Sequence, residues 1–293
     1  MKLPFGPTQL KLAVAFCLIY SLWGSTYLAI HYAIETISPF MMAGVRFSTA
    51  GILLYSVMRF TGAPNPSLRQ WLNLAVVGTF LFQGGNGLVV WAEQFITSGL
   101  AALLVSLLPL WLIMLDWLWA GGPPPTWKGS IGIFLGFIGV VVLIDPVQIT
   151  ATGIDLTGAL GVMFASLLWA TGSIYSKKFT QPKSIFMSAA CQMCGGGMAL
   201  LLTALLTGAF NDFEPVAVSL VSLSAFTYLV VFGPMVAISS YVWLLQNASA
   251  ASVSTYAFVN PAVAIFLGCL MQTKRSMPIS SWAPRLPCPV WCW

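Results

Sequence analysis

The sequence predicts an all-α integral membrane protein made of two five-helix halves that enter the membrane in opposite orientations. Of its 293 residues, 58% are hydrophobic and only 6% are charged, whereas soluble domains carry about 25% charged residues. The apolar runs are long and continuous, and the second half repeats motifs of the first. Because a bilayer offers the backbone no hydrogen-bonding partners, long apolar runs without alternation favour helices.

Each apolar run is long enough to cross a bilayer, which takes about 20 residues. Nine spans are predicted, at 12–32, 40–60, 71–91, 97–119, 128–145, 156–176, 185–207, 219–245 and 249–271.

The C-terminal segment 272–293 departs from this pattern. A partner for the span 128–145 is expected near residue 279, but the segment contains four prolines, which disrupt helices. We therefore divide the chain into a first repeat at 10–145, a truncated second repeat at 156–271 and an aberrant tail. Truncation and a shifted reading frame are both open explanations of the tail.

Charge in the loops predicts the orientation, because Lys and Arg collect on the cytoplasmic side. With the N-terminus cytoplasmic, that side receives Lys2, Lys11, Arg59, Arg69, Lys128, Lys177, Lys178 and Lys183. The opposite side receives Glu35, Glu93, Asp145, Asp155, Asp212 and Glu214. Lys274 and Arg275, which follow the ninth span, break the rule.

The two halves match at two offsets. At 146 residues, Trp23 aligns with Trp169 and the segment 38–43 with 184–189. At 152 residues, Pro109 aligns with Pro261. Because five spans are an odd number, the second half has to be inverted, as in many secondary transporters.

Several of these motifs resemble the EamA family of the drug/metabolite transporter superfamily, in particular bacterial inner-membrane exporters. The resemblance covers roughly residues 10–270 and is carried by WGSTYLAI at 23–30, PFMMAGVRF at 39–47, GNGLVVWAEQ at 85–94, SGLAALLVSLLPL at 98–110, LLWATGSIYSKK at 167–178 and ASVSTYAFVNPAVAIFLG at 251–268.

The resemblance implies ten helices around a central cavity, of which nine are clear here, and efflux of small metabolites that are amino-acid-like or amphipathic. The expected partners are a small-molecule substrate and the lipid bilayer, and coupling to protons or to a counter-solute stays open. Two alternatives to transport stay open. In the first, the chain is an inactive truncated copy of a transporter. In the second, it is a membrane receptor or interaction protein without transport activity.

Candidates for the cavity are polar and aromatic side chains inside the apolar spans. Aromatic faces suit amphipathic substrates, and amides or hydroxyls inside a membrane either bind a ligand or bond a neighbouring helix. These candidates are Trp23, Ser25, Asn86, Trp169, Thr171, Tyr241, Tyr256 and Asn260.

Arg46 is the sharpest single candidate. It lies about six residues inside the second span, where an arginine costs roughly 2.5–3.5 kcal/mol on insertion scales. It either faces inward, toward Glu93 or an anionic substrate group, or extends to the outer interface. A purely structural ion pair with Glu35 or Glu93 is the third reading.

Three prolines, Pro109, Pro234 and Pro261, are predicted to interrupt helices as hinges or as cavity-lining breaks. Glu93 and Asp116 are the candidates for ion coupling, although both lie near helix ends. The sequence does not decide the energy source.

Enzymatic function is not expected, because no nucleophile–base pair, phosphate-binding loop or metal-ligand motif is present in the sequence. Cys191 and Cys194 form a C-x-x-C pair inside a span, which we interpret as packing residues. No cofactor and no metal are predicted. The scattered basic residues form no stripe, so nucleic-acid binding is not expected either.

Overall fold

A computed structural model of the chain describes residues 7–122, 155–211, 213–248 and 255–275, with isolated residues between 124 and 138. Its elements are α1 (Pro7–Ala33), α2 (Pro39–Phe60), α3 (Leu68–Gly78), η1 (Thr79–Gly87), α4 (Leu88–Ala92), α5 (Ser98–Val105), α6 (Leu108–Trp119), α9 (Leu156–Tyr175), η2 (Ser176–Lys178), α10 (Ile185–Leu206), η3 (Pro215–Ala217), α11 (Leu220–Val230), η4 (Val231–Ala237), α12 (Ile238–Asn247) and α14 (Tyr256–Arg275).

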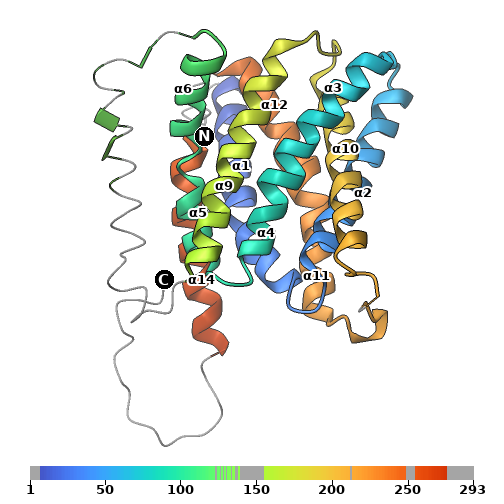
Figure 1. The fold of residues 1–293 in the computed structure, drawn as a ribbon, viewed down its shortest axis with the longest axis vertical. Coiled ribbons are helices and arrows are strands. Elements are labelled where there is room, and N and C mark those ends of the chain that lie inside the picture. The colour runs from blue at the N-terminus through green and yellow to red at the C-terminus, as the bar shows by residue number, and fades with distance from the viewer. Residues whose placement is uncertain are drawn as a thin grey trace, which may run out of the picture.

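The predicted all-helical membrane architecture is confirmed, and the described residues contain no strand. Six helices within them are long and apolar enough to cross a membrane: Gln9–Ala33, Pro39–Phe60, Leu68–Ala92, Ser98–Trp119, Leu156–Lys178 and Ile185–Leu206. The helices run roughly side by side as a bundle (Figure 1). The predicted span 128–145 lies largely outside the described residues. Of the predicted tail 272–293, α14 includes the residues up to Arg275, and 276–293 lie outside the described residues.

Local sequence sets where several helices begin. Ser67 and Gln70 form a reciprocal capping box at the start of α3, with the Ser67 side chain accepting from Gln70 N and Gln70 Oε1 accepting from Ser67 N. The helices α5, α9, α10 and α11 have simpler N-caps, in which the side chain of Thr97, Asp155, Ser184 or Ser219 accepts a backbone N–H of the first turn.

Two spans contain π-helical segments. η1 follows α3 directly, and η4 follows α11 directly, so that α3–η1–α4 and α11–η4–α12 are continuous helices with a widened turn. η1 begins at Thr79 and η4 at Val231, and 231 − 79 = 152 is the offset at which the halves align in sequence. Both segments include helix-weakening residues, Gly84–Gly85 in one and Gly233–Pro234 in the other.

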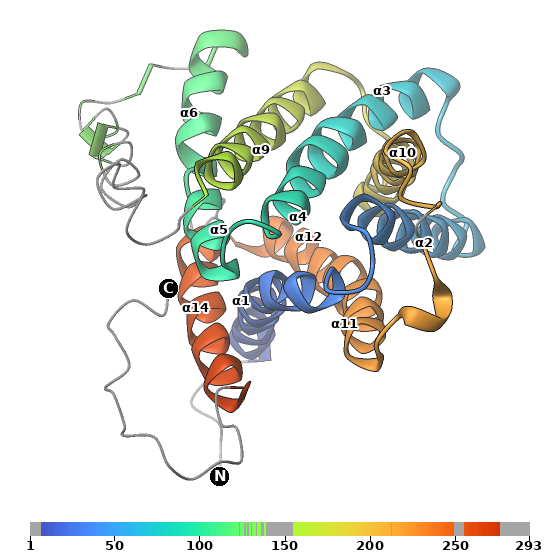
Figure 2. The same cartoon turned by 60° about the horizontal axis from the view of Figure 1, so that its bottom comes forward.

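Helices of the two halves interlock. α1 packs against α11, α12 and α14, while α9 packs against η1, α4, α5 and α6. α2 and α10 pack along each other (Figure 2). The first helix of each half therefore packs among the later helices of the other half. This is the arrangement expected when two repeats exchange their first helices.

Glycines allow the closest approach in this bundle. A Cβ on Gly78 of α3 would lie 1.9 Å from the Gln192 carbonyl oxygen of α10, and one on Gly196 would lie 2.3 Å from the Gly78 oxygen. The outer surface is apolar, with exposed side chains such as Ile52, Phe164 and Leu202. Small residues inside and apolar residues outside are typical of a helix bundle surrounded by lipid.

Candidate functional site

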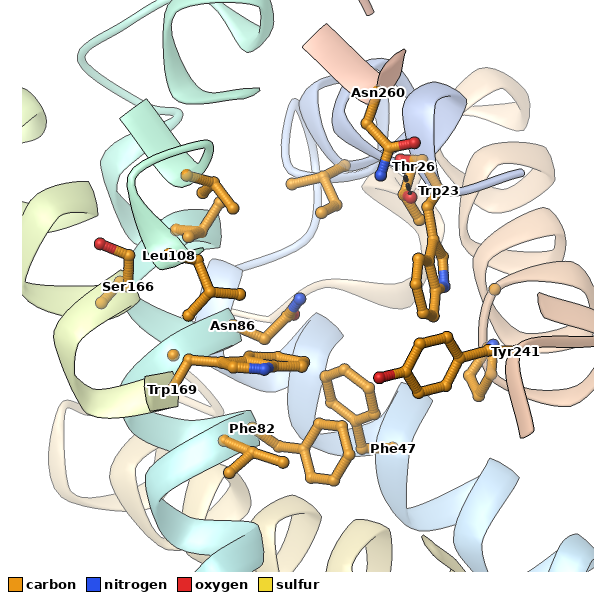
Figure 3. Close-up of a pocket in the computed structure, with 18 of the residues that line it drawn as sticks. Trp23, Thr26, Phe47, Phe82, Asn86, Leu108, Ser166, Trp169, Tyr241 and Asn260 are labelled. Atoms are coloured by element: carbon orange, nitrogen blue, oxygen red, sulfur yellow. Dashed lines mark hydrogen bonds between the residues drawn. The ribbon is translucent and has the colours of Figure 1, made fainter. Parts of the chain in front are cut away.

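A cavity of about 300 Å³ lies inside the helix bundle. Its wall is built from α1, α2, η1, α4, α5, α6, α9, α10, η4, α12 and α14, so most of the described bundle contributes to it. Its volume is at the lower end of the range for small-molecule sites. Figure 3 draws 18 of the lining residues and labels ten of them.

Aromatic side chains form two groups in the cavity wall. On one side Trp23 packs against Tyr241 and Tyr256, with ring centroids 5.2 and 4.7 Å away. On another, Trp169 meets Phe82 edge to face at 6.0 Å, and Phe82 contacts Phe47 at 4.5 Å. Asn86 lies in the space between the two groups in Figure 3. A flat apolar solute could be held between them.

Amide groups in the wall have free acceptors. The side-chain oxygens of Asn86, on η1, and Asn260, on α14, are buried and have no hydrogen-bond partner. Both residues line the cavity. A buried polar atom without a partner costs free energy, so a ligand donor could take up either position.

Arg46 also lines the cavity and is only 4% exposed. Its Nε and Nη1 atoms have no hydrogen-bond partner, and its Cζ lies 4.8 Å from the centroid of the Phe47 ring. The guanidinium therefore does not extend to the outer interface. It also forms no ion pair within 4.0 Å of either Glu93 or Glu35.

Glu93 ends α4 as its C-cap residue and is 2% exposed. Both carboxylate oxygens are buried without a hydrogen-bond partner. Glu93 does not line the cavity, but it is electrostatically coupled to Arg46 and to Tyr27, which do.

Asp116, the other coupling candidate, lies at the opposite end of the bundle. Its Oδ1 accepts a hydrogen bond from Lys177 Nζ at 3.0 Å, in an ion pair whose side chains are 37% and 63% exposed. It does not line the cavity.

Several other predicted residues lie outside the cavity wall. The Ser25 hydroxyl contacts the Leu22 carbonyl and Tyr228 Oη, at 3.0 and 2.6 Å. Thr171 donates to the Leu167 oxygen at 2.8 Å. Both hydroxyls therefore have helix partners of their own, whereas we expected them in the cavity.

The three prolines differ in their surroundings. Pro234 lies in η4 and lines the cavity. Pro109 follows a break between α5 and α6, and Pro261 lies within α14 beside Asn260. Neither Pro109 nor Pro261 lines the cavity.

The structure adds cavity residues that the sequence reading did not select. They include Thr26, Tyr27, Phe47, Phe82, Ser166 and Gln192. Gln192 could have been found from the repeat, because it aligns with Arg46 at the offset of 146 residues. Nothing in the sequence distinguishes Phe47 and Phe82 from phenylalanines that only pack between helices.

The C-x-x-C pair belongs to the packing of α10. Cys191 is buried in a cluster with Leu74 and Met187, and a Cβ on Gly51 of α2 would lie 2.8 Å from Cys194 Sγ. Within the described residues, no group of three His, Cys, Asp or Glu side chains could hold a metal ion.

Known proteins resemble the chain along most of its length. The inner membrane transporter YedA of Escherichia coli K12, described as uncharacterized, is 36% identical over 260 residues, covering 88% of this chain and 82% of that protein. The uncharacterized transporter YvbV of Bacillus subtilis is 27% identical over 269 residues, with the same coverages. Protein PecM of Dickeya dadantii is 27% identical over 250 residues, covering 85% and 80%.

The profile of the EamA-like transporter family matches the chain twice, over residues 11–145 and 156–283. These names point to transport rather than to catalysis. The chain belongs to the EamA-like transporter family.

Proposed function

We propose that the chain is a secondary transporter that exports small metabolites, either amino-acid-like or amphipathic, by alternating access. The observation that carries this proposal is the cavity itself, because it lies among helices of both halves and presents free polar atoms between aromatic groups. Membership of the EamA-like family supports the transporter role.

The helix breaks support alternating access. η1 contributes Asn86 to the cavity wall and η4 contributes Pro234. Interrupted helices at matching points of two repeats are characteristic of transporter binding sites. In the proposed cycle, α1 moves together with α11, α12 and α14 as one body. A second body consists of α9 and the later helices of the first half, and the two bodies move relative to the packed pair of α2 and α10.

The location of charges supports a cytoplasmic N-terminus. Arg69 and Lys178 line a common depression at one end of the bundle, and Gln70 Nε2 donates to the Thr180 oxygen there, at 3.3 Å. Glu93 and Asp155 lie toward the other end, at the connections after α4 and before α9. With the basic end cytoplasmic, these charges follow the positive-inside rule, from which Lys274 and Arg275 depart. The inner membrane is the proposed location.

Glu93 is the better placed of the two coupling candidates. A buried carboxylate without a hydrogen-bond partner is an expected proton-binding group in a transporter. Asp116 already has Lys177 as an exposed partner. Proton coupling through Glu93 is therefore part of the proposal.

The test compares cells that express the wild-type chain with cells that express Asn86→Leu or Arg69→Gln. Asn86 lines the cavity and Arg69 is exposed, so Arg69→Gln serves as the control. The cells are challenged with toxic amino-acid analogues and amphipathic drugs at matched membrane abundance. Export predicts resistance to a chemical class, lost in Asn86→Leu and kept in Arg69→Gln. Sensitivity equal to that of empty cells, despite normal insertion, would contradict the proposal.

A further inference from the structure

Arg46 is a buried cation with unpartnered hydrogen-bond donors. A guanidinium carries five N–H donors, and here neither Nε nor Nη1 has a partner. The residue is 4% exposed and lines the cavity. Burying a charged group without hydrogen bonds is unfavourable, so a partner from outside the protein would relieve the cost.

Packing, rather than hydrogen bonding, holds this guanidinium in place. Phe47 lies beneath it, with 4.8 Å between Cζ and the ring centroid. On η4, a Cβ added to Gly233 would lie 2.9 Å from Nη2. The backbone of the π-helical segment therefore lies directly beside the guanidinium.

Glu93 does not satisfy the guanidinium. It is electrostatically coupled to Arg46, but no oxygen of Glu93 lies within 4.0 Å of a nitrogen of Arg46. Glu93 also lies outside the cavity wall. Glu93 thus leaves the Nε and Nη1 donors of Arg46 without a partner.

We propose that Arg46 is the anion-binding group of the cavity and that the substrates are planar aromatic carboxylates of one or two rings. This inference rests on the proposed transport function. The substrate carboxylate accepts hydrogen bonds from the Arg46 guanidinium, as arginine forks bind carboxylates elsewhere. The ring lies between the group of Trp23, Tyr241 and Tyr256 and the group of Trp169, Phe82 and Phe47.

The free amide groups fit the same class of ligand. Asn86 and Asn260 have open acceptor oxygens in the cavity wall, so a ring N–H or hydroxyl of the substrate can donate to one of them.

Charge selectivity of the wild-type protein is the primary test. The purified full-length chain in lipid nanodiscs is titrated calorimetrically with three probes that share one ring system: indole-3-acetate, its neutral amide indole-3-acetamide and the cation tryptamine. The acetate is expected to bind about tenfold or more tightly than the amide, since hydrogen bonds to charged groups are worth that much. Equal or tighter binding of the amide or the amine would overturn the proposal.

Variants locate the selectivity. Arg46→Gln is expected to reduce the preference for the acetate to about one, Arg46→Lys to keep part of it, and the control Arg69→Gln to keep all of it. If Arg46→Gln does not fold, Arg46→Lys and the ranking of the three probes by the wild-type protein still test the site. Unchanged selectivity in folded Arg46→Gln would refute the assignment.

Proteoliposomes of the wild-type chain separate the two proposals. Transport of a neutral or cationic solute in preference to aromatic carboxylates would refute the substrate class and leave the transport function standing. Selective acetate binding without movement of any solute would keep the anion site and refute the transport function.

Discussion

Trp23 and Trp169 occupy matching positions in the two halves, 169 − 23 = 146 residues apart, and both line the same cavity. Trp23 comes from α1 and packs against Tyr241 and Tyr256, whereas Trp169 comes from α9 and packs against Phe82. Two different helices, one from each half, thus present one indole each to a shared space (Figure 3).

Substituting either indole by phenylalanine tests the aromatic walls. Trp23→Phe and Trp169→Phe are each expected to weaken solute affinity about two- to tenfold, since an aromatic contact contributes about 0.5–1.5 kcal/mol. The measurement is the KM for transport. Trp117→Phe is the control, because Trp117 is 45% exposed. Unchanged KM in both cavity variants would argue against a role of the walls in binding.

The close contact between α3 and α10 predicts a strong sensitivity to size. Gly196→Ala would place a methyl group 2.3 Å from the Gly78 oxygen, so we expect destabilisation of about 1–3 kcal/mol, typical of overpacking. Thermal unfolding in detergent measures it. Gly268→Ala is the matched control, since nothing lies within 4 Å of a Cβ there. It should be neutral or stabilising by up to about 1 kcal/mol. Similar midpoints for both variants would contradict the packing account.

Glu93 and Asp116 are expected to differ in their effect on pH dependence. Glu93 is buried and unpartnered, whereas Asp116 is part of an exposed pair with Lys177. Glu93→Gln should flatten the pH profile of transport, because it removes the coupling carboxylate. Asp116→Asn should leave the profile unchanged and alter stability by at most about 1 kcal/mol. The reverse result would move the coupling group to Asp116.

Asp155 predicts a stability difference that depends on pH. Its carboxylate accepts hydrogen bonds from the backbone N–H groups of Gly158 and Thr157, at 3.2 and 2.7 Å, and these bonds hold its pKa below the usual range. A lowered pKa means stabilisation that is present above the unfolded value, about 3.9, and is lost as the pH falls through the folded value.

We therefore expect Asp155→Ala to lower the thermal midpoint at pH 7 and to match the wild type in strong acid. Asp155→Asn keeps the cap without the charge, so it should lose less at pH 7. An Asp155→Ala deficit that is equal at both pH values would show that the cap contributes no pH-dependent stability.

The spans could be predicted from the sequence because lipid demands long apolar helices. Every predicted span except 128–145 overlaps a helix of the described residues. The positions of the breaks were visible in part, since Gly233–Pro234 weakens a helix locally. The π-helical form of these breaks could not be predicted. It depends on how the neighbouring helices accommodate the wider turn of a π-helix.

The cavity wall was harder to predict than the spans. Helices that are apolar all round carry little information about which face turns inward. Ser25 and Thr26 illustrate this, since adjacent residues point in directions about 100° apart. We selected Ser25 because it aligns with Thr171, but Thr26 lines the cavity and the Ser25 hydroxyl contacts Tyr228. The relation between Arg46 and Glu93 likewise depends on tertiary packing.

The most direct test of the central claim is solute counterflow into proteoliposomes that contain the purified chain. Wild-type protein and the Arg69→Gln control are expected to exchange at least one organic solute across the bilayer. Asn86→Leu and Trp169→Phe, folded to the same thermal midpoint, are expected to exchange it with weaker affinity. Exchange that is identical in all four proteins would contradict the assignment of this cavity as the transport site.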